Sequence, residues 1–240
     1  MKKMFLSLIT FISFIAFAQD SKVISDPNAK LRTLSGSFTA ISVSSGIDLY
    51  LTQGNEESIA VSASDEKYLP RFKTEVENGT LKIYYDNKGV TWTAHDNRKL
   101  KAYVSFKTLQ KLHGSAGAEV TVKGSITAEG LEMKFSSGSG FGGEINAKQL
   151  TVDQNSGSEI SISGKADKLT IDANSGASFK GYGLTVDYCN AEASSGAEVK
   201  ITINKELSAK ANSGGGIRYK GEALIRDINI SSGGAVKRGK

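Results

Sequence analysis

Hydrophobic and polar residues alternate with a period of two through most of the chain after residue 34. Leu150 and Val152 alternate with polar neighbours, and Ile160 and Ile162 alternate with serines a few residues later. This period is typical of short β-strands that bury one face against a core. The pattern therefore predicts an all-β protein.

The alternating runs recur in a repeat that closes with Ser-Gly. Well-matched copies end at Gly138, Gly157, Gly176, Gly196 and Gly214, and weaker copies end at Gly117 and Gly233; the intervals between these glycines are 21, 19, 19, 20, 18 and 19 residues. A short and nearly constant period indicates stacked supersecondary units. With two strands per unit and a polar turn at Gly164, like positions would stack ~4.8 Å apart. We therefore expect a parallel β-helix or a closely related solenoid.

The Ser-Gly sites are predicted to be the corners of the coils. Serine and asparagine bond to the local backbone at turns, and glycine accepts a positive φ. The predicted turn glycines are Gly46, Gly138, Gly157, Gly176, Gly196, Gly214 and Gly233. Asn155, Asn174 and Asn212 could stack into an amide ladder. A polar ridge that binds sugars or ions is the functional alternative to this structural role.

Residues 34–109 carry the same alternation in longer strands. Residues 73–77 and 81–85 flank Asn78-Gly79, which suits a type I′ hairpin turn. Residues 65–72 lack the period of two and could form one helical turn. No linker separates this N-terminal β region from the repeats of residues 110–240, so we expect the two to share one core.

The first residues have the form of a secretory signal peptide. Lys2 and Lys3 precede an apolar run, and Ala16-Phe17-Ala18 forms a cleavage site. We expect residues 1–18 to be removed and residues 19–33 to form a lead segment. The protein would then be exported, to the periplasm, the cell surface or the extracellular space, with no transmembrane segment in the mature chain.

Composition and charge narrow the classes of partner. Glycine is frequent, at 26 of 240 residues, whereas proline occurs twice, as suits β-structure rich in tight turns. Removal of two lysines with the signal peptide lowers the net charge from +5 to +3, with no basic block, which argues against nucleic acid. The one cysteine, Cys189, takes the place of Leu150 and Leu169 in its repeat and is predicted to lie in the core.

The sequence offers little catalytic chemistry, and no metal, cofactor or catalytic residue is predicted. His95 and His113 stand alone, and no cluster has metal-ligand spacing. Asp153, Asp172 and Glu192 occupy equivalent positions and would stack into an outward acidic row. Such a row could bind a cation or act in acid–base catalysis. Lys134 and Lys210 take the same position in the flanking repeats, which makes a solvated face the simpler interpretation.

A polar loop at residues 86–99 contains the candidate ligand contacts Trp92, His95, Asp96 and Arg98. An aromatic ring beside charged groups could stack on a sugar. The alternative is that Trp92 anchors the loop by packing.

Residues 44–54, Ser-Ser-Gly-Ile-Asp-Leu-Tyr-Leu-Thr-Gln-Gly, resemble the head GIN domain family of auto-transporter adhesins from Bacteroidetes-type bacteria. Residues 77–83, residues 100–106, the Ser-Gly repeats and the Phe-Ala-Gln end of the signal peptide match in the same order. The resemblance covers essentially the whole mature chain and implies a β-helical fold, export and an adhesive role. It implies no catalytic or ligand residues, and the chain is too short to add a membrane barrel to the passenger.

The sequence therefore favours an exported, non-enzymatic binding or structural protein of the cell envelope, an adhesin whose solenoid face contacts a polysaccharide or a cell-surface protein. One alternative is a polysaccharide-active lyase or hydrolase on the same scaffold. Another is a periplasmic assembly module that pairs through an open solenoid end, which would make the protein a homo-oligomer.

Overall fold

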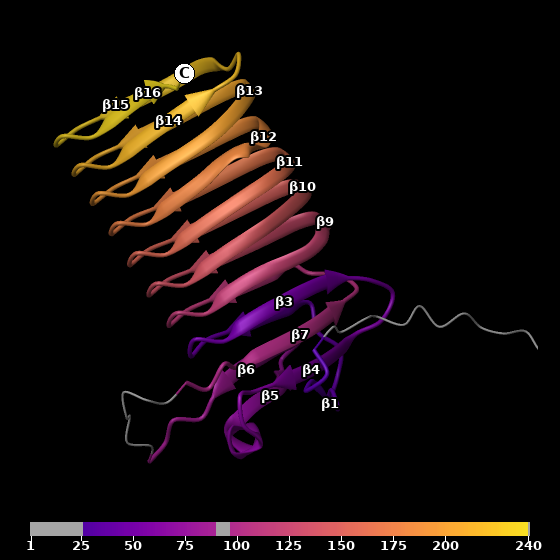
Figure 1. Ribbon diagram of the computed structural model, residues 1–240. Helices are drawn as coiled ribbons and strands as arrows, with labels where there is room; N and C mark the ends of the chain where they lie inside the picture. Colours follow the sequence, from indigo (N-terminus) through magenta and orange to yellow (C-terminus); the bar gives the residue numbers. More distant parts are fainter. Residues whose placement is uncertain (1–25, 90–96, 240) are drawn as a thin grey trace, which may run out of the picture.

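Parallel strands stacked in chain order make up most of the protein (Figure 1). The computed structural model describes residues 26–89 and 97–239. Each of five long strands, 14 to 17 residues in length, forms one coil and pairs in parallel with the next. These strands are β9 (Glu119–Phe135), β10 (Gly140–Gln154), β11 (Glu159–Ala173), β12 (Ser178–Ala193) and β13 (Glu198–Ala211). The predicted all-β parallel solenoid is confirmed.

The register between coils follows the spacing of the Ser-Gly sites. Gly140 pairs with Glu159, Glu159 with Ser178, Ser178 with Glu198, and Glu198 with Gly216. Where one coil is longer than its neighbour, the register shifts locally, as between Ser161 and Ser163. The sequence interval is therefore the length of one coil.

The two short strands expected in each unit are joined into one long strand. Gly164, where a polar turn was expected, pairs with Ile145 on one side and Leu184 on the other. Its φ is +110°, and a Cβ there would lie 2.2 Å from the carbonyl oxygen of Ile145. The chain bends at this glycine without leaving the ladder, because neighbouring coils satisfy the backbone groups that a local turn would otherwise satisfy.

A tight turn closes each coil at the Ser-Gly site. At Ser156-Gly157 both residues have positive φ, and the N–H of Ser158 donates to the carbonyl of Asn155 at 3.2 Å, as in a type I′ turn. The N–H of Gly157 donates to the carbonyl of Ser175 in the next coil at 3.1 Å, so the turns form their own ladder. The predicted turn glycines Gly46, Gly138, Gly157, Gly176, Gly196, Gly214 and Gly233 have φ between 65° and 78°, and Gly117, after Ala116, makes the same turn with φ of 72°.

The N-terminal β region adds coils that do not follow chain order. Strand β2 (Ala40–Val43) lies between β6 (Thr80–Tyr85) and β8 (Lys111–Gly114), and all three are parallel. On the other side, β3 (Asp48–Gln53) lies between β7 (Lys101–Phe106) and β9. In space, the coil formed by β6 and β7 therefore comes first, the coil formed by β2 and β3 second, and the coil formed by β8 and β9 third. The loop at residues 86–99 connects β6 to β7, at the point where the other coils have a tight turn.

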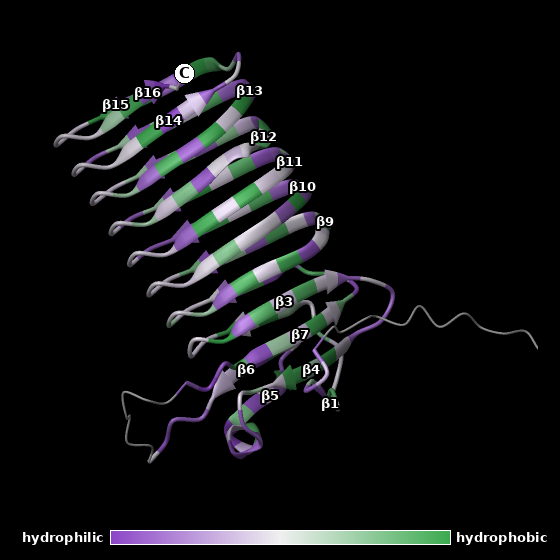
Figure 2. Ribbon diagram, viewed as in Figure 1, coloured by the Kyte–Doolittle hydropathy of each residue, from purple (hydrophilic) through white to green (hydrophobic). Residues whose placement is uncertain are grey.

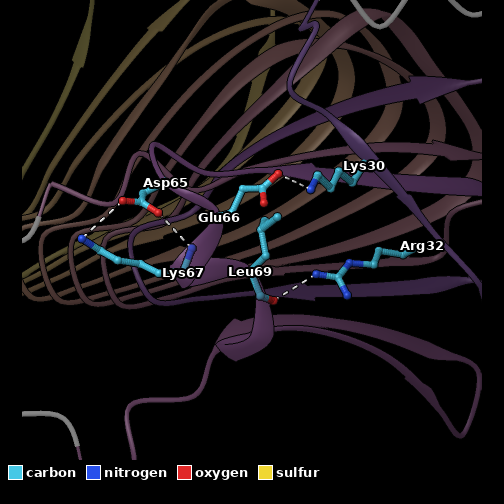
Figure 3. Close-up of polar contacts among 6 residues, drawn as sticks. All are labelled: Lys30, Arg32, Asp65, Glu66, Lys67 and Leu69. Carbon is cyan, nitrogen blue, oxygen red and sulfur yellow. Dashed lines mark hydrogen bonds and ion pairs between the residues drawn. The ribbon is translucent and has the colours of Figure 1, made fainter.

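Antiparallel strands and a short helix cover the N-terminal end. Strand β5 (Phe72–Glu77) forms the predicted hairpin with β6, β4 (Ser58–Ser62) pairs with β7, and β1 (Lys30–Arg32) pairs with β4. The predicted helical turn is a 3-10 helix, η1 (Glu66–Arg71). Figure 3 shows how β1 is fastened to it: Lys30 pairs with Glu66, and Arg32 donates to the carbonyl of Leu69 at 3.0 Å.

One hydrophobic core runs from Phe38 to Ile217, so the two regions share it as expected. Hydrophobic and hydrophilic positions alternate along each coil (Figure 2). Cys189 is buried and pairs in register with Leu169, as predicted. The chain ends in three short strands, β14 (Gly216–Lys220), β15 (Leu224–Ile230) and β16 (Ala235–Arg238), and every residue of β15 is exposed.

Candidate binding surface

The loop at residues 86–99 joins the end of β6 to the start of β7, and its described residues 86–89 and 97–99 lie at the edge formed by the tight turns (Figure 1). Trp92, His95 and Asp96 lie outside the described residues. Arg98 is 7% exposed; its guanidinium stacks over the ring of Tyr85 at 4.2 Å and donates to Asn87 Oδ1 at 3.1 Å. Arg98 therefore packs at the base of the loop, and a ligand contact by the loop remains a prediction.

The acidic row forms as expected. Asp153 pairs in register with Lys134 and Asp172, and Glu192 pairs with Asp172 and Lys210. Burial, together with the carboxylates of Glu192 and Asp153, raises the pKa of Asp172. Lys210 neutralises Glu192 with an Nζ–Oε1 distance of 2.7 Å. The row has lysines at both ends, as the sequence predicted.

The described residues contain no group of three or more histidine, cysteine, aspartate or glutamate side chains placed to hold a metal ion. His113 is half-buried, and this burial lowers its pKa and favours the neutral imidazole. It lies in the register position of Lys134 on the neighbouring coil.

A second row was not predicted from the sequence. It lies on the strand segment that follows each turn, whereas the acidic row lies on the segment that precedes each turn. Each member lies four residues after a turn glycine and pairs in register with the member of the next coil. We call this row the outer column: Tyr50, Thr121, Gly142, Ser161, Lys180, Lys200, Arg218 and Lys237. The constant offset from the Ser-Gly sites was a usable signal, because every copy of the repeat carries it.

The residue types of the outer column change from aromatic to small to cationic along the solenoid. At the N-terminal end the rings of Tyr50 and Tyr103 stack with centroids 5.2 Å apart. Small residues follow, and the last four members are all cations. Lys180, Arg218 and Lys237 are exposed, and their side chains point away from the core.

A shallow groove of about 500 Å³ lies where the small members meet the cationic ones. Gly142, Ser161 and Ser163 line it together with Lys180 and Lys200 from the cationic part. Tyr182 also lines the groove, and Lys220 Nζ lies 4.6 Å from the centre of its ring. The outer column thus offers an elongated surface that is hollowed at this groove.

The fold and this surface define a class: an all-β parallel solenoid with long, register-aligned rows of exposed polar side chains. Residues 37–223 match the family described as "Putative auto-transporter adhesin, head GIN domain". The chain belongs to this head GIN domain family, as the resemblance at residues 44–54 predicted.

Solved structures share the fold. A "putative adhesin" from Bacteroides fragilis has a TM-score of 0.79 at 14% identity, covering 88% of this chain and 96% of that one. A "putative adhesin" from Parabacteroides distasonis has a TM-score of 0.69 at 18% identity, with the same coverage. A "putative lipid binding protein" from Parabacteroides distasonis has a TM-score of 0.61 at 19% identity, covering 90% of this chain and 98% of that one.

A comparison with curated proteins finds no match. Within residues 26–89 and 97–239, no helix has the length and apolar character needed to cross a membrane. The predicted signal peptide lies outside the described residues.

Proposed function

We propose that this protein is an exported, non-enzymatic binding protein of the cell envelope that adheres through the side of its solenoid. The outer column carries the proposal, because it aligns exposed side chains from successive coils into one extended surface. Continuous pairing between coils makes such a surface rigid, so little conformational entropy is lost when a long ligand binds along it. The adhesin names of the family and of two structural neighbours agree with this role.

A glycan array tests the proposal with residues 19–240 produced as a folded, fluorescently labelled protein. We expect selective retention on a subset of polysaccharides. The same protein unfolded by heat and then cooled serves as the control for nonspecific adsorption. Retention of neither polysaccharides nor intact bacterial surfaces by the folded protein would contradict an adhesive role.

A second candidate function, assembly through the open end, is favoured by the exposed last coil. Ile225 pairs in register with Leu207, and Ile228 pairs with Ala209, and both partners lie in the core. The two side chains of the last coil are nevertheless exposed, Ile225 by 36% and Ile228 by 39%. An apolar strand with an unpaired edge is a site where another chain can add a strand. In a two-fold pair of β15 strands, the antiparallel register that places Ile225 opposite Ile228 also places Arg226 opposite Asp227.

Light scattering after size-exclusion chromatography tests this second candidate. A second copy at the open end predicts a dimer that dissociates on dilution. Ile228→Lys should keep the protein monomeric, whereas Lys210→Glu, on the neighbouring coil but facing outward, should leave the dimer intact. A wild-type monomer at all concentrations would exclude assembly through this end.

A further inference from the structure

We infer that the outer column is a binding site for an extended acidic polysaccharide with one carboxylate on each sugar. This inference rests on the proposed function and names the class of ligand. Lys180, Lys200, Arg218 and Lys237 supply the cations, and the adjoining groove would receive the sugar rings.

The spacing of the cations suits a linear polyanion. The four side chains occupy successive coils in direct register, so their backbones repeat at the separation of neighbouring strands, ~4.8 Å. This repeat is about the length of one sugar in an extended chain, so each carboxylate that the chain turns toward the column would lie within reach of a cation. Lysine and arginine bound to carboxylates form charge-assisted hydrogen bonds, which are stronger than neutral ones.

The cationic part keeps a positive excess after its ion pairs are counted. Glu159 pairs with Lys180 at 2.6 Å, and Glu198 pairs with Lys200 at 3.1 Å and also with Arg218. Lys237 lies one position further along the column, where the flanking position holds Ala235 in place of a glutamate. Four cations of the column thus face the two carboxylates of their ion pairs. Glu144 also lines the groove and adds a third carboxylate, whereas Lys220 beside Tyr182 adds a fifth cation, so the excess stays positive. Exposed pairs of this kind are weak enough to exchange partners with a ligand.

The groove favours a sugar chain over single-stranded nucleic acid. It is lined by the small residues Gly142, Ser161 and Ser163 and by one aromatic residue, Tyr182. Proteins that hold single strands use several aromatic side chains on which successive bases stack. Small and hydroxylated residues beside one tyrosine instead suit hydrogen bonding and a single stacking contact with a sugar.

The experiment measures binding of polygalacturonate to residues 19–240 by biolayer interferometry, with the fully methyl-esterified polymer as the neutral probe. Lys180→Gln with Lys200→Gln should weaken binding of the acidic polymer by roughly tenfold or more, because two charge-assisted contacts are lost. Added salt should weaken the wild type more than this variant.

The control is Lys134→Gln with Lys210→Gln. These lysines also lie exposed in register on the coils and also pair with one glutamate each, Glu132 and Glu192, but they belong to the acidic row. This variant removes the same charge and should bind as the wild type does. Gly142→Val provides a charge-neutral test, since nothing lies within 4 Å of a Cβ there and the larger side chain should fill the groove and weaken binding.

Equal losses in the two lysine variants, equal binding of the neutral polymer, or equally tight binding of single-stranded DNA would each overturn the inference. Binding of neutral glycans alone on the array would also overturn it, while leaving the proposed adhesive function intact. Absence of binding to any glycan or cell surface would contradict both. Thermal unfolding of each variant verifies that the fold is retained.

Discussion

At the scale of single residues, the solenoid depends on turn positions where the backbone conformation is strained by a Cβ atom. The Ser-Gly turns require two consecutive residues with positive φ, and one of them is a serine in most coils, such as Ser156 and Ser175. Serine is strained in this region, whereas glycine is not. The sequence pattern predicted the glycines but not the serine conformation, because serine is not a residue expected at positive φ.

Gly157→Ala should lower the free energy of unfolding by about 1–2 kcal/mol, the cost of holding a Cβ in the left-handed region. No atom lies within 4 Å of that Cβ, so the effect would come from the backbone alone. Gly142→Ala is the matched control, since its site is equally open and its φ is not positive. Chemical denaturation measures both, and equal losses would contradict this interpretation.

Cys189 should be inert in the folded protein. Burial raises the pKa of its thiol to about 12, so the reactive thiolate is scarcely populated at pH 8. We expect maleimide labelling only at the rate of unfolding, and rapid labelling in denaturant. Thr170→Cys combined with Cys189→Ala offers an exposed thiol for comparison; rapid labelling of wild-type Cys189 would show that this part of the core is open.

At the scale of elements, stacking in register converts a sequence position into a continuous row. Similar side chains from successive repeats therefore stack on one another. This stacking stabilises the fold in the hydrophobic core and destabilises it where side chains of like charge align. Asp153, Asp172 and Glu192 are the clearest case of such a conflict.

Asp172→Asn should raise the free energy of unfolding at pH 7 by about 0.2–1 kcal/mol, the range for cross-strand charge pairs. The pKa of Asp172 is raised on folding, so the folded state binds its proton more tightly than the unfolded state. Its contribution to stability is present below the ordinary value of 3.8 and is lost as the pH rises through the higher folded pKa. The variant should flatten this part of the pH profile. Asp167→Asn, outside the row and near Lys148 and Lys205, removes no like-charge contact of the row and should not raise the free energy of unfolding at pH 7.

The register between neighbouring coils could be predicted from the sequence because a turn glycine marks each coil. The same counting placed Cys189 in the core and the acidic row on the surface. It did not yield the order of the N-terminal strands, since β2 is inserted between β6 and β8 by contacts distant in sequence. The outer column was also missed, because its members share a position but not a residue type.

At the scale of the whole molecule, the two ends differ. The N-terminal end carries antiparallel strands and η1, whereas β15 at the other end is exposed throughout. In a stacked array each coil is held mainly by its neighbours, so stability should fall toward the uncovered end.

Hydrogen exchange should therefore be slowest in β10 to β12 and fastest in β15 and β16. The amides of the inner strands are paired on both sides, and opening them requires several coils to separate. Mass spectrometry of peptic peptides at two protein concentrations measures this gradient. Protection of β15 that rises with concentration would indicate end-to-end pairing, and uniform protection along the chain would contradict the expected gradient.

The parallel stacking also determines how the protein would respond to mechanical load. A pull along the solenoid axis acts across the hydrogen bonds between coils, so they would separate one coil at a time from the uncovered end. Each coil of about 19 residues would release ~60 Å of chain, at ~3.3 Å per residue. An adhesin built in this way would lengthen in steps under shear and dissipate energy at each step, which would let an attached cell hold on through brief surges of flow.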